Sequence, residues 1–184
     1  MSITGTHHRT GSVVVVNDTG KPVRAVSVVH KYSDNYSDDH VWPDLEPGAE
    51  SDPMQVRYNT GPFTTGRDWW LVAWMSEDGH VLFHTDPQNF RDVMDAFETA
   101  APAIATLVGV AATSESGGWG GAAGAAIVAP FVNSSKTSGF KQHILREEDP
   151  LTRIHIGDRS VVWKSPSGRS ETGVARTPVG SETQ

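Results

Sequence analysis

The sequence predicts a mainly β fold, an antiparallel β-sandwich that carries an inserted α-helical hairpin. Three observations favour it: short apolar runs separated by turn signals, one tryptophan-rich run too short for a helix, and a single long stretch with helical spacing. A chain of 184 residues suits one domain. We expect a flexible segment at 1–11, a sandwich domain over 12–164, the helical insertion at about 87–132, and a disordered tail at 165–184.

The tryptophan-rich run at 69–75 is the centre of the predicted sheet. Its seven residues are all apolar, and they follow no helical spacing. Such a run is typical of a strand that is buried on both faces. Because side chains alternate along a strand, two sets should face opposite ways: Trp69, Leu71, Ala73 and Met75 on one side, and Trp70, Val72 and Trp74 on the other.

Two strands are expected before this run, and a third leads into it. Residues 13–16 and 23–31 are rich in valine and flank an Asn-Asp-Thr-Gly-Lys-Pro turn, which predicts an antiparallel hairpin. A polar loop should cover 32–40. The alternation at 54–58 predicts the third strand.

Asp78-Gly79 is a strong hairpin signal, and it returns the chain along 80–84. Asp86-Pro87 then predicts the start of a helix, because Asp caps free N–H groups and Pro fits the first turn. An apolar stripe continues to about residue 111, with Pro102 expected to kink or divide the helix. Residues 120–132 are small and apolar, and they predict a second helix packed against the first.

Three final strands are predicted at 141–146, 152–156 and 160–164. Gly157-Asp158 supplies a two-residue turn between the last two. After residue 164 there is no apolar period, and Gly, Pro, Ser and Thr dominate. This composition predicts a disordered tail.

Composition excludes several classes of function. The net charge of −7, without a cluster of Lys and Arg, argues against a nucleic-acid partner. The absence of cysteine excludes disulfides, thiolate chemistry and cysteine-ligated zinc. The motifs of common serine hydrolases, zinc proteases and P-loop enzymes are also missing. The polar N-terminus lacks a secretory signal, so a cytoplasmic location is expected, with leaderless secretion left open.

Several short motifs resemble one known domain family. They are Val16-Asn17-Asp18-Thr19-Gly20, Val28-Val29-His30-Lys31-Tyr32-Ser33-Asp34, Trp42, Tyr58-Asn59-Thr60-Gly61 and Asp68-Trp69-Trp70. Together they are similar to the family named for up-regulation in a nematode insulin-receptor mutant, which has relatives in fungi and bacteria. The resemblance covers roughly residues 12–90, and it implies a fold more than an activity.

Aromatic and polar residues from separate segments are expected to meet at one end of the sandwich. Aromatic faces with a few polar groups form sites for sugars or flat apolar ligands. The sequence therefore predicts a binding module for a small molecule or glycan. The predicted ligand-binding residues are Tyr32, Tyr36, Trp42, Tyr58, Asn59, Asp68 and Trp70.

An enzyme is the alternative interpretation of the same residues. An Asp in an apolar pocket has a raised pKa and could exchange a proton with a substrate. The reaction would be an isomerisation, cyclisation or lyase step without an organic cofactor. Its candidate acid–base residues are Asp34, Asp68 and His30.

Carboxylates in the predicted loop suggest a metal alternative. Asp34, Asp38 and Asp39, with Asp44 nearby, supply the hard oxygen ligands that Ca²⁺ takes, although their spacing is not that of an EF-hand. A solvated loop explains the same composition. Zinc held by His30 and His40 has no support from spacing.

The helical hairpin raises the question of a membrane partner. Residues 100–132 are almost uncharged, but each arm is shorter than the ~20 residues that span a bilayer. Small residues permit close helix packing in lipid and in water alike. A buried structural pair, an oligomer interface and a toxin-like membrane-inserting element therefore all remain open.

Overall fold

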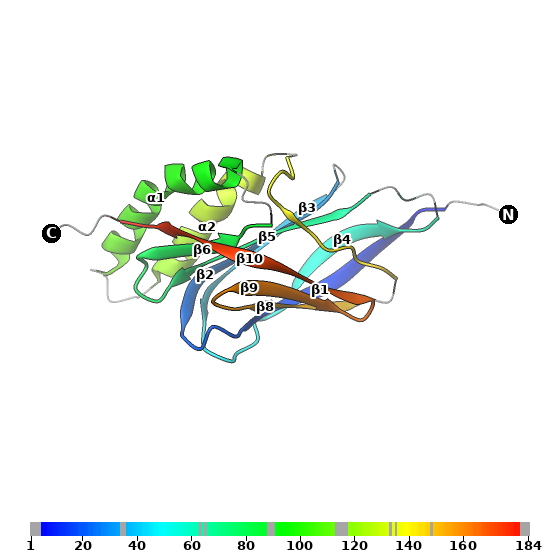
Figure 1. Cartoon of the computed structure of the whole chain (residues 1–184), viewed down its shortest axis with the longest axis horizontal. Helices are drawn as coiled ribbons and strands as arrows, with labels where there is room; N and C mark the ends of the chain where they lie inside the picture. Colours follow the sequence, from blue (N-terminus) through cyan, green and yellow to red (C-terminus); the bar gives the residue numbers. More distant parts are fainter. Residues whose placement is uncertain are drawn as a thin grey trace.

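A computed structural model describes residues 5–33, 36–62, 64, 66–87, 91–112, 118–132, 134, 136–147 and 149–180. Two helices lie on one side of a large curved sheet (Figure 1). The elements in chain order are β1 (His7–Asn17), β2 (Val23–Tyr32), β3 (Tyr36–Leu45), β4 (Met54–Thr60), β5 (Asp68–Ser76), β6 (Val81–Thr85), α1 (Arg91–Ala112), α2 (Trp119–Val132), β7 (Lys141–Gln142), β8 (Leu151–Ile156), β9 (Ser160–Ser165) and β10 (Gly168–Pro178).

The strands form one nearly closed, barrel-like sheet. Their order is β3-β2-β5-β6-β10-β9-β8-β1-β4, and β7 adds a short pairing to β5. The sheet is mixed, because β1 runs parallel to β8 and the other pairs are antiparallel. Its two edges approach each other where Asp38 of β3 accepts hydrogen bonds from the backbone N–H (2.8 Å) and Nε (2.9 Å) of Arg57 on β4.

The mainly β fold with two helices is confirmed, but the structure does not show a sandwich of two sheets. The reason is β10, which pairs with β6 on one side and β9 on the other and joins the two halves of the sheet. A disordered tail was predicted here, and that prediction is wrong for residues 168–178. At the other end, β1 already pairs with β4 from His7 onward, inside the segment expected to be flexible.

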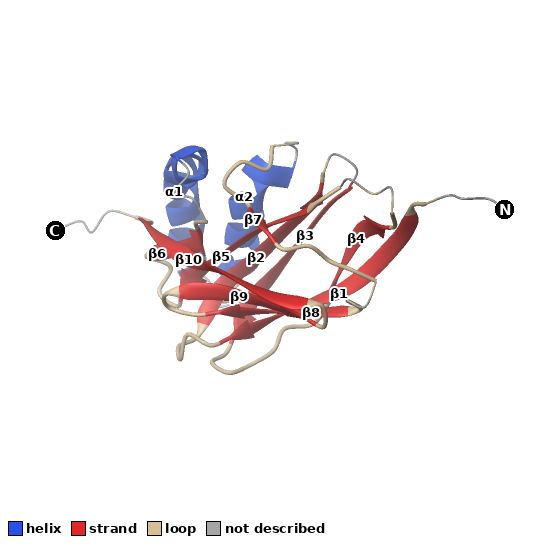
Figure 2. Cartoon of the chain, turned by 45° about the vertical axis from the view of Figure 1, so that its right-hand side comes forward, coloured by secondary structure: helices blue, strands red, loops and turns tan. Residues whose placement is uncertain are grey.

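The tryptophan strand is confirmed as a central strand covered on both faces. Trp70, Val72 and Trp74 of β5 point into the barrel, with valines, tyrosines and Trp163 from the other strands around them. Leu71, Ala73 and Met75 lie on the outer face, beneath the helices. The molecule therefore has two cores, one inside the barrel and one between the sheet and the helices. Figure 2 shows the two helices as a layer beside the sheet.

Two predicted pairings are wrong. β1 and β2 do not form a hairpin, because β1 pairs with β4 and β8 while β2 pairs with β3 and β5. The polar stretch expected as a loop at 32–40 instead enters a strand at Tyr36, and β3 forms the hairpin with β2. Its polar side chains are tolerated because β3 lies at the sheet edge, where one face reaches solvent. Of the strand predicted at 141–146, only β7 forms.

The Asp78-Gly79 and Gly157-Asp158 turns join antiparallel neighbours as expected. Gly79 has φ = 76°, a left-handed conformation that favours glycine. Pro102 lies within α1 without dividing it.

Lys31 ties the segment after α2 to the outer face of β2. Its Nζ donates to the carbonyl oxygens of Ser134 and Lys136, and lies 5.0 Å from the centre of the Phe140 ring. Burial lowers the pKa of this lysine. Both carbonyl groups accept hydrogen bonds from a charged donor, and such charge-assisted bonds are stronger than neutral ones.

Glycines allow α2 to pack directly on β3. A Cβ added at Gly120 would lie 2.2 Å from the Pro43 carbonyl oxygen, and one at Gly124 would lie 2.2 Å from a Val41 methyl group. By contrast, a Cβ at Gly109 of α1 would meet nothing within 4 Å. These two helices therefore offer a matched pair of glycine positions.

We expect Gly120→Ala to lower the free energy of unfolding by about 1–3 kcal/mol, because backbone must move to admit the methyl group. Gly109→Ala should leave stability unchanged or raise it by up to about 1 kcal/mol, since alanine favours helix. Urea denaturation of both variants measures the difference. Equal effects would show that the α2–β3 contact is looser than described.

Candidate functional site

Three of the predicted polar residues meet inside one end of the barrel. His30 of β2 faces inward, and its Nε2 donates to Asp68 Oδ1 of β5 at 2.7 Å. Its Nδ1 lies 3.6 Å from Asp38 Oδ2 of β3. His30 and Asp68 are 0% and 1% exposed. Asp68 Oδ2 also accepts the backbone N–H of Leu145 at 2.9 Å, so this carboxylate anchors the segment that crosses the barrel end.

The neighbouring carboxylates control the charge of the buried imidazole. Burial disfavours protonation of His30, but the hydrogen bonds and charges of Asp38 and Asp68 outweigh it, and its pKa is raised. Burial alone would also raise the pKa of Asp38. Hydrogen bonds from His30 and Arg57 instead hold the pKa of this carboxyl below its ordinary value.

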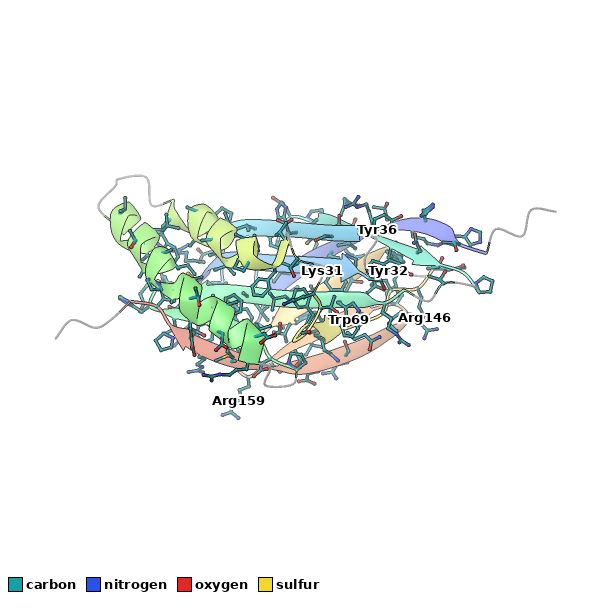
Figure 3. All side chains as sticks on the ribbon, turned by 90° about the horizontal axis from the view of Figure 1, so that it is seen from above. Lys31, Tyr32, Tyr36, Trp69, Arg146 and Arg159 are labelled. Carbon is teal, nitrogen blue, oxygen red and sulfur yellow. The ribbon has the colours of Figure 1, made fainter. Side chains whose placement is uncertain are left out.

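Two tyrosines and an asparagine lie at the same end. The rings of Tyr32 and Tyr36 are 6.1 Å apart. Tyr36 Oη lies 2.9 Å from His8 Nδ1 and 3.4 Å from Asn59 Oδ1. Tyr32 is buried, and burial, with the charges of Asp68 and Tyr36, raises the pKa of its hydroxyl. Figure 3 places Tyr32, Tyr36 and Arg146 toward the same end of the molecule.

The remaining predicted ligand-binding residues belong to the barrel interior. Tyr58 donates to the Arg146 carbonyl oxygen at 3.0 Å, and Trp70 Nε1 donates to that of His143 at 2.9 Å. Both therefore hold the segment at 143–146 against the barrel end. Trp42 is 6% exposed in the middle of β3, and its ring centre lies 4.6 Å from that of His40.

A cavity of about 780 Å³ lies over this barrel end. Ile144, Leu145 and Pro62 form apolar parts of its wall, and Arg67 and Arg146 are exposed beside them. The full lining is Asn59, Thr60, Gly61, Pro62, Thr64, Gly66, Arg67, Ile144, Leu145, Arg146 and Glu147.

The charges around this cavity are not balanced. Glu147 forms an ion pair with Arg9 at 3.3 Å. Neither Arg67 nor Arg146 has a carboxylate partner among the described residues. Tyr32 lies directly behind Gly66, where a Cβ would come within 2.3 Å of its hydroxyl oxygen. That hydroxyl has no well-formed hydrogen bond in the described part of the chain, although the Gly66 backbone is close enough to affect its pKa.

Of the predicted site residues that the structure describes, only Asn59 lines the cavity, and the predicted aromatics lie behind or away from it. Sequence reasoning missed Arg67, Arg146, Ile144 and Leu145. Arg67 stands directly before the tryptophan strand, and this position is the one feature of the sequence that could have marked it as a site residue. Ile144, Leu145 and Arg146 reach the cavity because β7 pairs with β5, and no local sequence pattern predicts this pairing.

A comparison with known families covers most of this architecture. The family described as "Up-Regulated in long-lived daf-2" matches residues 7–174. The chain belongs to this family. The match extends beyond the resemblance at 12–90. It includes both helices of this chain and the residues that line its cavity. None of the curated proteins compared with the chain matches it significantly.

The described residues do not bring together the carboxylates that were predicted to bind a metal ion. Asp38 is engaged by His30 and Arg57, while Asp39, its neighbour on β3, points to the opposite face of the strand. Asp34 lies outside the described residues. Within the described ranges, no group of three or more His, Asp or Glu side chains is placed to hold a metal ion.

The membrane hypothesis for residues 100–132 stays a prediction. The helix over Arg91–Val110 is long and apolar enough to cross a membrane, and 17% of its most apolar window is buried. The inner faces of both helices pack on the sheet through residues such as Phe97, Ile104 and Ile127. Length and composition alone are weak evidence for a membrane span, because a mostly buried core helix passes the same test, and the low burial of this window does not decide between the two.

Proposed function

We propose that this chain is a ligand-binding module whose barrel-end cavity receives a small anionic molecule. The observation that carries the proposal is the pair Arg67 and Arg146, exposed and without carboxylate partners among the described residues, beside the apolar side chains of Ile144 and Leu145. Arginine binds carboxylates and phosphates through parallel N–H donors. An anion with a short apolar tail would satisfy both parts of this wall.

The same geometry favours a small anion over a glycan. Sugars stack on open aromatic faces, but Tyr32, Tyr58 and Trp70 are 1%, 2% and 0% exposed. The half-buried ring of Tyr36 is covered by the Arg57 guanidinium, 5.0 Å from its centre. The volume of about 780 Å³ falls within the range of ligand pockets.

Binding is also better supported than acid–base catalysis. A general base must reach the proton that it abstracts. His30 and Asp68 lie below the cavity rather than in its wall, and both are bonded to other protein groups. We infer that this pair holds the barrel end closed and supports the cavity from beneath.

n-Butyl phosphate is a suitable probe, since it joins a phosphate to a short apolar tail. We expect it to shift the backbone amide resonances of Gly66, Arg67 and Arg146 in a nuclear magnetic resonance titration. Arg146→Glu should weaken binding by about tenfold or more, because it removes a charge-assisted hydrogen bond and adds a like charge.

Arg153→Glu is the matched control, since Arg153 is an exposed arginine of β8 outside the cavity. Its affinity for the probe should equal that of the unaltered protein. Equal binding by the Arg146 and Arg153 variants, or shifts confined to other segments, would overturn the proposal.

A further inference from the structure

A small cavity of about 290 Å³ lies next to the first one, between the segment at 142–146 and the residues at 167–170 that lead into β10. Ile144 and Arg146 line both cavities, so the two are neighbours. The described lining of the small cavity contains two arginines, Arg146 and Arg169, and no carboxylate. Its wall is therefore positively charged, and its volume suits a single charged group better than a whole organic ligand.

Four side chains linked by hydrogen bonds lead to this cavity. Thr152 Oγ1 lies 2.7 Å from Ser165 Oγ, which lies 2.8 Å from Nε2 of His143. The other ring nitrogen, Nδ1, lies 2.7 Å from Ser170 Oγ. Thr152 is 1% exposed, whereas Ser170 is half-buried and lines the cavity. The chain of bonds therefore connects a buried hydroxyl to one that a ligand can reach.

Burial fixes the direction of these bonds. Ser165 is the hydrogen-bond partner of the Thr152 hydroxyl among the described residues, and a buried hydrogen without an acceptor is costly. Thr152 must therefore donate to Ser165, and Ser165 to Nε2 of His143. The imidazole then carries its proton on Nδ1 and donates it to Ser170. Burial lowers the pKa of His143 to about 4, which keeps this ring neutral at physiological pH.

Two donors in the cavity wall are left for a ligand. The Ser170 oxygen accepts from His143, and its own hydrogen has no acceptor among the described residues. Hydrogen bonds that run in one direction polarise one another, which makes this hydroxyl a stronger donor. The side-chain Nε2 of Gln142, another lining residue, is buried and has no hydrogen-bond partner in the described part of the chain. Unpaired donors beside positive charge match a ligand with several acceptor oxygens.

Both arginines keep N–H groups for such a ligand. Arg169 Nη2 lies 3.1 Å from Glu171 Oε2, but the two side chains are 58% and 44% exposed, so this ion pair is weak. A guanidinium carries five N–H donors, and this contact uses one of them. Arg146 has no carboxylate partner among the described residues.

We propose that this cavity binds a phosphate group. Its oxygens accept hydrogen bonds from Ser170 and Gln142 and lie between the guanidinium groups of Arg146 and Arg169, which pair with phosphate through parallel N–H donors. Donors on separate segments suit the oxygens of a tetrahedral ion better than the two of a carboxylate. The group is either a free ion or the head of a phosphomonoester whose tail lies along Ile144, toward the first cavity. Apart from the shared Arg146, the site does not depend on the function proposed above.

A nuclear magnetic resonance titration with inorganic phosphate at constant ionic strength tests the site. We expect shifts of the backbone amides of Arg169 and Ser170 and of the side-chain amide of Gln142. Arg169→Gln should weaken phosphate binding about fivefold or more, because it removes a charged donor. Arg153→Gln is the matched control and should bind as the unaltered protein does. Arg153 is also exposed, pairs with Glu50 at 3.3 Å and lies outside both cavities.

n-Butyl phosphate distinguishes the two sources of the phosphate group. Tighter binding than inorganic phosphate, with added shifts at Gly66 and Arg67, identifies the head of an organic ligand, and weaker binding identifies the free ion. Equal affinity of the Arg169 and Arg153 variants for inorganic phosphate would overturn the site and leave the proposed function standing. Shifts confined to the small cavity with both probes would support the site and overturn the proposed function instead.

The proton position on His143 gives a second, independent test. Nitrogen chemical shifts of the imidazole at neutral pH should show a neutral ring that is protonated on Nδ1. A proton on Nε2 would make Ser170 the donor to His143, which would remove the free hydroxyl hydrogen from the cavity and overturn the proposal. Unchanged melting temperatures should show that both arginine variants fold, since each replaces an exposed side chain.

Discussion

Trp70→Ala is expected to lower the free energy of unfolding by about 3–5 kcal/mol. The Trp70 side chain is 0% exposed at the centre of the barrel core, and the ring of His30 lies 4.4 Å away. Its Nε1 also donates to the His143 carbonyl oxygen, which would lose this partner. The truncation therefore combines a large cavity with an unpaired buried acceptor.

Urea denaturation measures this loss, with an unchanged dependence on urea concentration as evidence of two-state unfolding. Trp69→Ala is the control, because Trp69 (labelled in Figure 3) is the residue before Trp70 in β5 but is only half-buried, on the helical side of the sheet. It should cost clearly less. If the two variants lost the same stability, the barrel interior would not be the dominant core.

Asp68→Ala should cost about 3–5 kcal/mol, the range found when one partner of a buried ion pair is removed. It leaves His30 with Asp38 alone and leaves the Leu145 N–H without its acceptor. Asp39→Ala is the control, since Asp39 is exposed on the edge strand and should change stability by less than about 0.5 kcal/mol. A small effect at Asp68 would mean that the buried pair contributes little to closing the barrel.

The dependence of the unfolding free energy on pH tests whether His30 is charged beside Asp38 and Asp68. The pKa of His30 is raised above its ordinary value of 6.5, so its stabilising contribution is complete below pH 6.5 and is lost as the pH rises through the raised pKa. The pKa of Asp38 is lowered from 3.8, so its contribution is present above that pH and is lost on acidification. Unfolding free energies between pH 5 and 9 should fall on the alkaline side for the unaltered protein and much less for Asp68→Ala. Identical slopes would contradict a charged His30.

Local patterns predicted the elements that depend on local physics. The seven apolar residues of β5 led to a strand covered on both faces, and the alternation placed each side chain on its observed side. The tight turns at Asp78-Gly79 and Gly157-Asp158 were also predicted from their residues alone. Both helices followed from apolar spacing and small residues.

The closure of the sheet could not be predicted, because it depends on β10. This strand has few large apolar side chains, and two of its buried positions are Thr172 and Thr177. Its order comes from backbone pairing with β6 and β9, which are distant in sequence. Without β10, the remaining strands divide into two sets, and a sandwich is the natural conclusion.

The candidate site likewise has a part that could be predicted from the sequence and a part that could not. Sequence reasoning placed Tyr32, Tyr36, Trp42, Tyr58 and Trp70, with Asp34, Asn59 and Asp68, at one end. Tyr32, Tyr36, Asn59 and Asp68 do lie near one another, whereas Trp42 lies against His40 along β3. This reasoning did not predict how deeply the rings are buried, since inward orientation in a barrel leaves little solvent contact. Arg67 and Arg146 line one cavity because long-range contacts hold the segment at 143–146 against the barrel end: the short β5–β7 pairing and the hydrogen bonds from Tyr58, Trp70 and Asp68.

The position of β10 in the chain has a consequence for biosynthesis. Strand β1 finds its partner β8 only after more than half of the chain has left the ribosome, and β10 emerges later still. Until residues 168–178 appear, β6 and β9 each present an unpaired edge, and such edges promote aggregation. A nascent chain stalled or cleaved before Gly168 should therefore depend on chaperones that shield open strands, whereas the finished chain closes these edges itself.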